Sequence, residues 1–286
     1  MIVAIAAGLA LAIPSSGDGA GPGRPGLGDL EITQTAGRVL TTLRLAHGEL
    51  APVVFDTGTS GNIVDRKLAA RLGLPNIGAS TANDGSLGKP ISGFLTEVDG
   101  ASLGGVPIGD GQANAIDYDL PGKKGIFGPG SFPGRLVVMD LGHGSIKVAP
   151  KTASTVPSGV AIPYIGQGDD ALPSVVVDFG VLKISAELDT GNNEALILPL
   201  SLASQLPLDG PLKTVGFATS AGGRQPLYRA RLKGVVTIGP LTLDRPTILF
   251  IEGGQPNVGL PIARRLDVVF DPSERRSWLL APASSR

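Results

Sequence analysis

The chain has 286 residues and a formal net charge of -1 at pH 7, so overall charge gives no reason to expect binding to nucleic acid or to an anionic membrane surface. Its 42 glycines and 24 prolines break helices and form turns, which favours many short strands over a helical bundle. It has no cysteine and only two histidines, which excludes disulfides, thiolate nucleophiles and multi-histidine metal sites. We therefore expect no metal and no other cofactor, and we expect His47 and His143 to lie in exposed loops.

Residues 1–13 are almost entirely apolar. This run is too short for a comfortable membrane span, so we expect no stable span, but it suits the core of a signal peptide. Ala10-Leu11-Ala12 offers a small-x-small cleavage pattern. No lysine or arginine precedes the run, and a disordered or truncated N-terminus is therefore the alternative. The favoured interpretation is export to the periplasm or the medium, with a cytoplasmic location as the alternative.

Residues 14–28 are rich in glycine, proline and serine and predict a flexible linker. Strand-like segments at 30–45 and 50–55 then suggest a hairpin that turns near His47-Gly48. The second of these segments runs directly into an Asp-Thr-Gly tripeptide at 56–58. Downstream come a helical pattern, an apolar-apolar-glycine element, a strand that ends in aspartate and a closing strand, at residues 63–72, 126–128, 136–140 and 145–148.

Residues 151–159, with proline, serine and threonine, predict a connection, after which the same succession returns. Segments 175–179 and 182–188 suggest a matching hairpin around Gly180, and the second of them runs into another Asp-Thr-Gly at 189–191. Further β-branched strands are predicted at 234–239 and 247–250. The equivalents of the four downstream elements lie at residues 200–206, 257–259, 266–271 and 277–280.

One Asp-Thr-Gly tripeptide would be a weak indication, because an aspartate before a glycine is usually a turn residue. Here two copies share their downstream spacing, and the separation from Gly128 to Asp140 equals that from Gly259 to Asp271. We expect structural roles for Asp140 and Asp271, each at the end of a strand. The predicted organisation is a signal peptide with linker, an N-terminal lobe, a connection and a C-terminal lobe, at residues 1–28, 29–150, 151–159 and 160–286. Side chains predicted to fill the core are Leu68, Leu72, Leu200, Leu202, Leu206 and Trp278.

The duplicated aspartates suggest a hydrolytic chemistry. Two carboxylates held a few ångströms apart cannot both ionise cheaply, so they share one proton. The ionised member can take a proton from water while the protonated member polarises a scissile carbonyl, with no metal and no covalent intermediate. We therefore predict that Asp56 and Asp189 form a catalytic pair.

The residues beside the aspartates suit this role. Gly58 and Gly191 let a backbone N–H approach a carboxylate closely. Thr57 and Thr190 can form hydrogen bonds across a pseudo-twofold axis, and Thr59 can form one with the outer oxygen of Asp56.

Asp56-Thr57-Gly58-Thr59-Ser60, Asp189-Thr190-Gly191, the glycine elements and the strand-end aspartates together resemble the aspartic peptidases, specifically bacterial retropepsin-like and pepsin-like proteins with two D-T-G lobes on one chain. The resemblance covers about residues 29–281. It implies an all-β, bilobal acid-protease fold, with two pseudo-twofold-related, β-barrel-like lobes and a cleft between them. It also implies an aspartic endopeptidase that binds an extended peptide or an unfolded protein. A monomer is expected, because one chain supplies both aspartates.

Some residues depart from the family pattern. The second motif continues with Asn192 in place of threonine or serine, which alters the support for Asp189. The stretch before the first lobe argues against a pepsin-like pro-segment, and no tyrosine falls where a pepsin-like flap is expected. Glycine-containing stretches at 83–88 and 220–223 are either flap tips or ordinary hairpin turns. The candidate flap glycines are Gly85, Gly88, Gly222 and Gly223. A catalytically inactive peptide-binding protein of the same fold is the alternative to an active enzyme.

Overall fold

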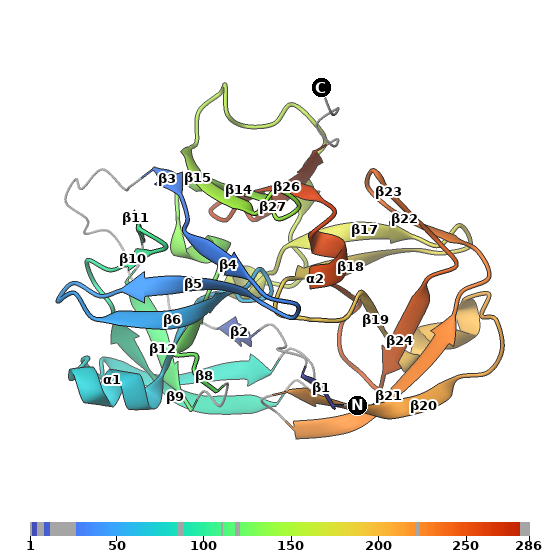
Figure 1. Cartoon of the computed structure of the whole chain (residues 1–286), viewed down its shortest axis with the longest axis horizontal. Helices are drawn as coiled ribbons and strands as arrows, with labels where there is room; N and C mark the ends of the chain where they lie inside the picture. The colour runs from blue at the N-terminus through green and yellow to red at the C-terminus, as the bar shows by residue number, and fades with distance from the viewer. Residues whose placement is uncertain are drawn as a thin grey trace.

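The computed structural model describes residues 2–4, 9–11, 27–84, 89–109, 111–117, 121–220 and 223–280. Within these residues the chain forms the predicted all-β, two-lobed architecture. In Figure 1 the first lobe lies on the left in blue to green and the second on the right in yellow to red. A third sheet, at the top of the view, takes strands from both halves of the chain.

In the sheet of the first lobe, β13 lies between β6 and β7. β13 pairs parallel with β6 on one side and antiparallel with β7 on the other. The register places Ile126 opposite Val54. The described strands of this sheet are β2 (Leu9–Leu11), β4 (Ile32–Gln34), β5 (Val39–Arg44), β6 (Leu50–Phe55), β7 (Asn62–Asp65), β8 (Gly78–Asp84), β9 (Pro90–Glu97), β10 (Ser102–Leu103), β11 (Val106–Pro107), β12 (Gln112–Ile116) and β13 (Gly125–Phe127).

The sheet of the second lobe repeats this arrangement. β25 pairs parallel with β18 and antiparallel with β19. Here the register places Asn257 opposite Glu187. The described strands of this sheet are β1 (Ile2–Ala4), β17 (Ser174–Asp178), β18 (Lys183–Asp189), β19 (Leu196–Pro199), β20 (Lys213–Ser220), β21 (Gly223–Arg231), β22 (Val235–Ile238), β23 (Leu241–Asp244), β24 (Thr247–Ile251) and β25 (Asn257–Gly259).

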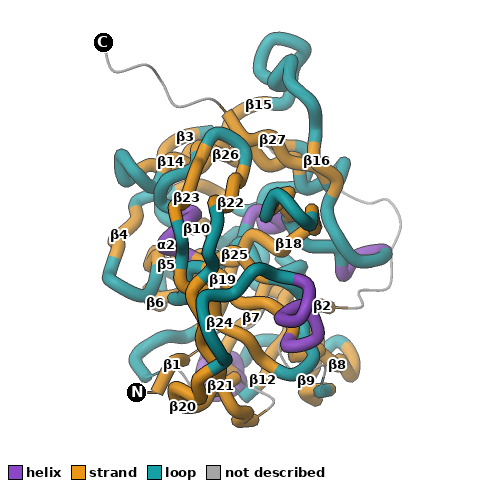
Figure 2. Tube along the Cα trace, turned by 90° about the vertical axis from the view of Figure 1, so that its right-hand side faces the viewer, coloured by secondary structure: helices purple, strands orange, loops and turns teal. Residues whose placement is uncertain are grey.

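The third sheet joins the two halves. Its centre is the antiparallel pair β14 and β26, with Val137 opposite Phe270. Figure 2 shows its strands at the top, at the opposite end of the molecule from β20 and β21. Its described strands are β3 (Gly28–Asp29), β14 (Arg135–Asp140), β15 (Ser145–Pro150), β16 (Ile162–Pro163), β26 (Asp267–Asp271) and β27 (Arg276–Leu280). The described helices are short: α1 (Arg66–Leu72), α2 (Leu260–Ala263), η1 (Pro129–Ser131), η2 (Gly168–Asp170) and η3 (Leu200–Gln205).

The core predictions are confirmed. Leu68 and Leu206 are buried in the main core, and the remaining predicted leucines are partly buried against it, whereas Trp278 is buried in a separate cluster with Leu136 and Val269. Both histidines are exposed, as predicted. Trp278 also donates from its indole nitrogen to the Gly159 carbonyl, which fixes the connection against β27.

Two predicted elements have different boundaries. Segment 30–45 is not one strand: the chain turns back between β4 and β5, where Thr35 and Arg38 exchange backbone and side-chain hydrogen bonds. The helical pattern at 63–72 begins as β7, because the β-branched side chains of Ile63 and Val64 are fully buried between neighbouring strands. The helix starts only at Arg66, after Asp65 accepts a hydrogen bond from the Lys67 N–H.

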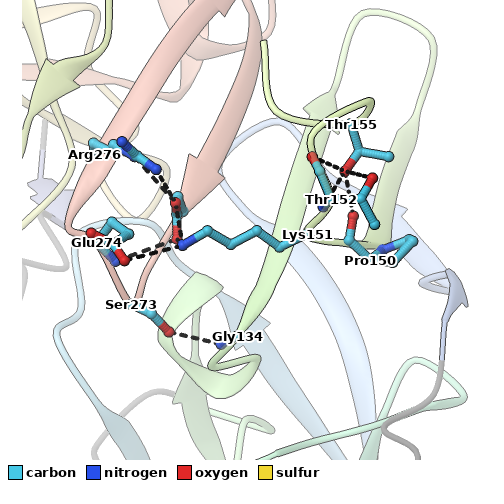
Figure 3. A network of polar contacts seen from close by, with 9 residues as sticks. Gly134, Pro150, Lys151, Thr152, Thr155, Ser273, Glu274 and Arg276 are labelled. Atoms are coloured by element: carbon cyan, nitrogen blue, oxygen red, sulfur yellow. Dashed lines mark hydrogen bonds and ion pairs between the residues drawn. The ribbon is translucent and has the colours of Figure 1, made fainter.

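The strand-end aspartates have the structural roles that were predicted. Asp140 binds the exposed His143. Asp271 is fully buried and lies 2.9 Å from Lys151 Nζ and 3.2 Å from Arg276 Nη2. Lys151, Glu274 and Arg276 converge at this point (Figure 3). Since Lys151 directly follows β15, this ion cluster ties the end of the first half to the third-sheet strands of the second half.

The hairpins β8–β9 and β20–β21 each carry an additional strand from the N-terminal region. β2 pairs antiparallel with β8, and β1 pairs parallel with β20. These are the outer strands of the two hairpins, so the N-terminal strands cover both outer edges. No helix among the described residues is long and apolar enough to cross a membrane.

Candidate active site

Each predicted catalytic aspartate lies at the end of a central strand of its lobe. Asp56 follows β6, and its backbone N–H donates to the Phe127 carbonyl on β13. Asp189 ends β18 and pairs with Gly259 on β25. Both side chains are buried. The structure therefore brings the two Asp-Thr-Gly loops together at equivalent places in the two lobes.

The two threonines lock these loops to each other. Thr57 donates from its hydroxyl to the Leu188 carbonyl, at 2.5 Å, and Thr190 donates to the Phe55 carbonyl, at 3.2 Å. In return the N–H of each threonine donates to the hydroxyl oxygen of the other, both at 3.0 Å. Four buried hydrogen bonds thus cross between the lobes in a near-symmetric pattern, which fixes the two aspartates relative to each other.

The carboxyls are held by backbone N–H groups. Oδ1 of Asp56 accepts from Gly58, at 2.8 Å, and from Gly191, at 3.0 Å. Oδ1 of Asp189 accepts from the same Gly191 N–H, at 2.7 Å, and from Asn192, at 3.1 Å. One N–H group therefore bridges both carboxyls. No donor among the described residues reaches Oδ2 of Asp56, which leaves that oxygen able to accept a proton.

Gly58 and Gly191 are required by close packing across the pair. A Cβ atom at Gly58 would lie 2.7 Å from Cγ of Asp189, and one at Gly191 would lie 2.7 Å from Cγ of Asp56. Real Cβ atoms do not approach other atoms this closely, so any side chain here would push the opposite carboxyl away. Each glycine thus makes room for the aspartate of the other lobe.

We expect Gly191→Ala to lower kcat/KM for the peptide hydrolysis that the sequence predicts by about a hundredfold or more, because a displacement of about 1 Å at reacting groups has an effect of this size. Steady-state kinetics would measure it. Gly234→Ala is the matched control, because a Cβ there meets nothing within 4 Å. Equal rates for the parent and Gly191→Ala would contradict the close-packing argument.

Two predicted supporting side chains act differently from expectation. The Thr59 hydroxyl donates to the Gly61 carbonyl at 2.7 Å and not to Asp56, because the chain turns back at this point. The Asn192 side chain does not reach the pair either. Its Nδ2 donates to Oδ1 of Asn257, and Nδ2 of Asn257 donates to Oδ2 of Asp189 at 2.8 Å. Asn192 thus supports Asp189 through its backbone N–H and through Asn257.

Sequence reasoning missed three residues around the pair. Asn257 occupies the position that Ile126 has in the first half, and Glu187 occupies the position of Val54. A comparison of the two halves for polar residues at apolar positions would have found both. Arg38, at the turn between β4 and β5, acts on Asp56 through its positive charge, and no sequence pattern indicates that proximity.

The two carboxyls have unequal environments. Burial raises the pKa of Asp56, but the N–H groups of Gly58 and Gly191, a hydrogen bond with Asp189 and the charge of Arg38 all lower it. The pKa of Asp189 is raised well above its usual range by burial, by the charge of Asp56 and by the charge of Glu187. The pKa of both carboxyls is raised by burial, and the negative charges of Asp56 and Glu187 add to this for Asp189, which favours Asp189 as the carboxyl that keeps a shared proton.

The predicted flap glycines are only partly described. Gly85, Gly88 and Gly222 lie outside the described residues, whereas Gly223 is the first residue of β21 and pairs with Ser220. Within the ranges that the structure describes, no group of three or more histidine, aspartate or glutamate residues is arranged to hold a metal ion.

Two lobes that each deliver an Asp-Thr-Gly loop to a shared axis define the class of bilobal proteins with an aspartate pair. A family model described as aspartyl protease matches residues 34–129 and 174–260, one region in each lobe. The chain belongs to the aspartyl protease family. A search of the curated proteins finds no match for it.

Proposed function

We propose that the protein is an active aspartic endopeptidase in which Asp56 acts as the base and Asp189 as the acid. The observation that carries this proposal is the Gly191 N–H, which donates to Oδ1 of both carboxyls and thus places them on either side of one point. The unequal electrostatic environments of Asp56 and Asp189 support the division of roles.

The reaction follows from one shared proton. Oδ2 of Asp56 takes a proton from a water molecule, whose oxygen attacks the scissile carbonyl, while Asp189 donates its proton to the carbonyl oxygen. The tetrahedral intermediate then collapses: Asp56 passes its proton to the leaving nitrogen, the carbon–nitrogen bond breaks, and Asp189 recovers its proton from the intermediate. The aspartates end as they began, so the cycle needs no covalent intermediate.

We propose an extended peptide or an unfolded protein as the substrate, bound between the lobes and covered by the hairpins β8–β9 and β20–β21. The matching of the two hairpins in the two sheets supports a retropepsin-like subtype, as does the absence of tyrosine from residues 78–97. We further propose that the protein acts as a monomer and is exported, with lobes at residues 29–150 and 160–286 and the connection at 151–159.

The test is a digest of a peptide library by the parent and by Asp189→Asn at several pH values. We expect the parent to cleave internal peptide bonds and Asp189→Asn to lose this activity at every pH, because Asn cannot supply the proton. Neither a serine-directed reagent nor a chelator should reduce cleavage by the parent. Cleavage that survives in Asp189→Asn would refute the proposed mechanism.

An inactive peptide-binding protein is the second candidate, and one observation favours it. Asp189 accepts hydrogen bonds from two backbone N–H groups and from Asn257, with no hydroxyl group among its described partners, unlike the threonine or serine of the usual motif. The same digest decides between the candidates. A binding protein would show no turnover in the parent and would keep its affinity for peptides in both aspartate variants.

A further inference from the structure

A third acidic side chain lies beside the aspartate pair. Glu187 stands two residues before Asp189 on β18, so both side chains project from the same face of the strand. Only 4% of Glu187 is exposed, and its Oε1 has no hydrogen-bond partner among the described residues. A buried polar atom without a partner is costly, so its retention needs a reason.

Glu187 lies beside the same glycine as the catalytic carboxyl. A Cβ atom at Gly58 would lie 2.8 Å from Oε1 of Glu187 and 2.7 Å from Oδ1 of Asp189. Both carboxyls therefore occupy the space that a side chain at Gly58 would fill, beside the loop that holds Asp56. The site thus contains three neighbouring carboxyls, not two.

The comparison between the lobes shows that this carboxyl is not required by the fold. In the first lobe the equivalent strand pair is apolar, with Val54 opposite Ile126. In the second lobe it is polar, with Glu187 opposite Asn257. Asn257 is bonded to Asp189, so both polar replacements occur beside the same aspartate. Glu187 and Asn257 thus both lie beside Asp189, the aspartate that is proposed to hold the proton.

We propose that Glu187 is a positioning residue, a third buried carboxyl beside the pair whose charge, when it is ionised, holds Asp189 in the protonated state that peptide hydrolysis requires. This inference rests on the proposed function of the aspartate pair. Glu187 acts through Asp189, and the proton transfers to and from substrate remain those of Asp56 and Asp189.

Among the residues that the structure describes, few charged groups act on this cluster. Burial raises the pKa of Glu187 to about 8, with a smaller contribution from the charge of Asp56 in the first lobe. The charge of Glu187 in turn raises the pKa of Asp189. Arg38, from the β4–β5 turn, acts on Asp56. The strand neighbours of Glu187, Ser174 on β17 and Asn257 on β25, are neutral. Each proton lost from the cluster therefore makes the next one harder to remove.

The kinetic test compares the pH profile of kcat/KM for the parent, Glu187→Gln and the control Glu252→Gln, an exposed glutamate of the same lobe. In Glu187→Gln we expect the alkaline limb to move to lower pH by about one pH unit or more, because the repelling charge is gone. The control should keep the limb of the parent. An unmoved limb in Glu187→Gln, with or without a uniform loss of rate, would overturn the proposal.

Thermal unfolding gives a readout that does not depend on turnover. A carboxyl whose folded-state pKa is raised contributes stability that is present below its unfolded pKa of 4.5 and is lost as pH rises through about 8. We therefore expect the Tm of the parent to fall relative to that of Glu187→Gln between pH 4.5 and pH 8. A constant difference in Tm over that range would overturn the proposal even if the parent hydrolyses no peptide.

A measurement on the parent covers the case in which Glu187→Gln does not fold. With glutamate labelled by carbon-13 at its side-chain carboxyl, nuclear magnetic resonance should show one glutamate with a titration midpoint near 8. That midpoint should fall in Asp56→Asn, because the charge of Asp56 helps to raise it. Titration of every glutamate in its ordinary range would refute a protonated third carboxyl, whatever the activity of the enzyme.

Discussion

Asp56→Asn is expected to lower kcat/KM for peptide hydrolysis by about a thousandfold or more and to leave the protein at least as stable as the parent at pH 7. The loss follows because the asparagine amide cannot take a proton from water, and acid–base catalysis contributes about 10²–10⁴-fold. The stability follows because burial raises the pKa of Asp56 in the folded state. A carboxyl of this kind stabilises the folded protein below its unfolded pKa, and this contribution is lost as pH rises through its folded pKa. Steady-state kinetics and thermal unfolding at pH 7 would measure both effects.

Asp140→Asn is the control for this variant. Asp140 also ends a strand, but it pairs with the exposed His143, in the third sheet. Asp140→Asn should keep the kcat/KM of the parent. A large loss of stability in Asp56→Asn would show that the buried charge supports the fold, contrary to the cost expected for burying it.

The largest effect on stability is expected for Asp271→Asn. Asp271 is fully buried, and its removal as an anion leaves Lys151 and Arg276 without their shared partner. We expect the free energy of unfolding to fall by about 2–3 kcal/mol, at or just below the range found when one member of a buried ion pair is removed, because Lys151 and Arg276 are themselves partly exposed. Chemical denaturation would measure this, and Tm should fall by roughly 5–10 °C.

Glu49→Gln provides the comparison for an exposed ion pair. Glu49 binds Arg71 at 2.9 Å, but both side chains are substantially exposed. Such a pair contributes up to about 1 kcal/mol, so Glu49→Gln should change the stability little. Similar losses in Glu49→Gln and Asp271→Asn would mean that burial does not strengthen the ion cluster of the third sheet.

The sequence was sufficient for the features that the repeat encodes. Two Asp-Thr-Gly tripeptides with matched downstream spacing predicted two similar lobes, and the turn residues around Gly180 predicted the hairpin of β17 and β18. These features are local or periodic, so a linear pattern records them. The same comparison of halves contained Glu187 and Asn257 as polar exceptions, although attention to the tripeptides alone passed over them.

The remaining features depend on contacts between distant segments. Arg38 approaches Asp56 only because the chain turns back at Thr35 and Arg38, and that turn was hidden within one apparently continuous strand. The hydroxyl of Thr59 has a choice of acceptors, and the local turn presents the Gly61 carbonyl to it. Residue type and spacing do not specify such choices, because several partners satisfy the same donor.

The pairing of β1 and β2 links the first residues of the chain to the outer edges of both hairpins. The outer edges of β8 and β20 already have a strand of the same chain beside them, and this added strand satisfies main-chain groups that would otherwise be open to pairing with another strand. Cleavage after Ala12 would release both strands at once. The chain without these residues would therefore present two unoccupied rows of main-chain hydrogen-bonding groups, one on each hairpin.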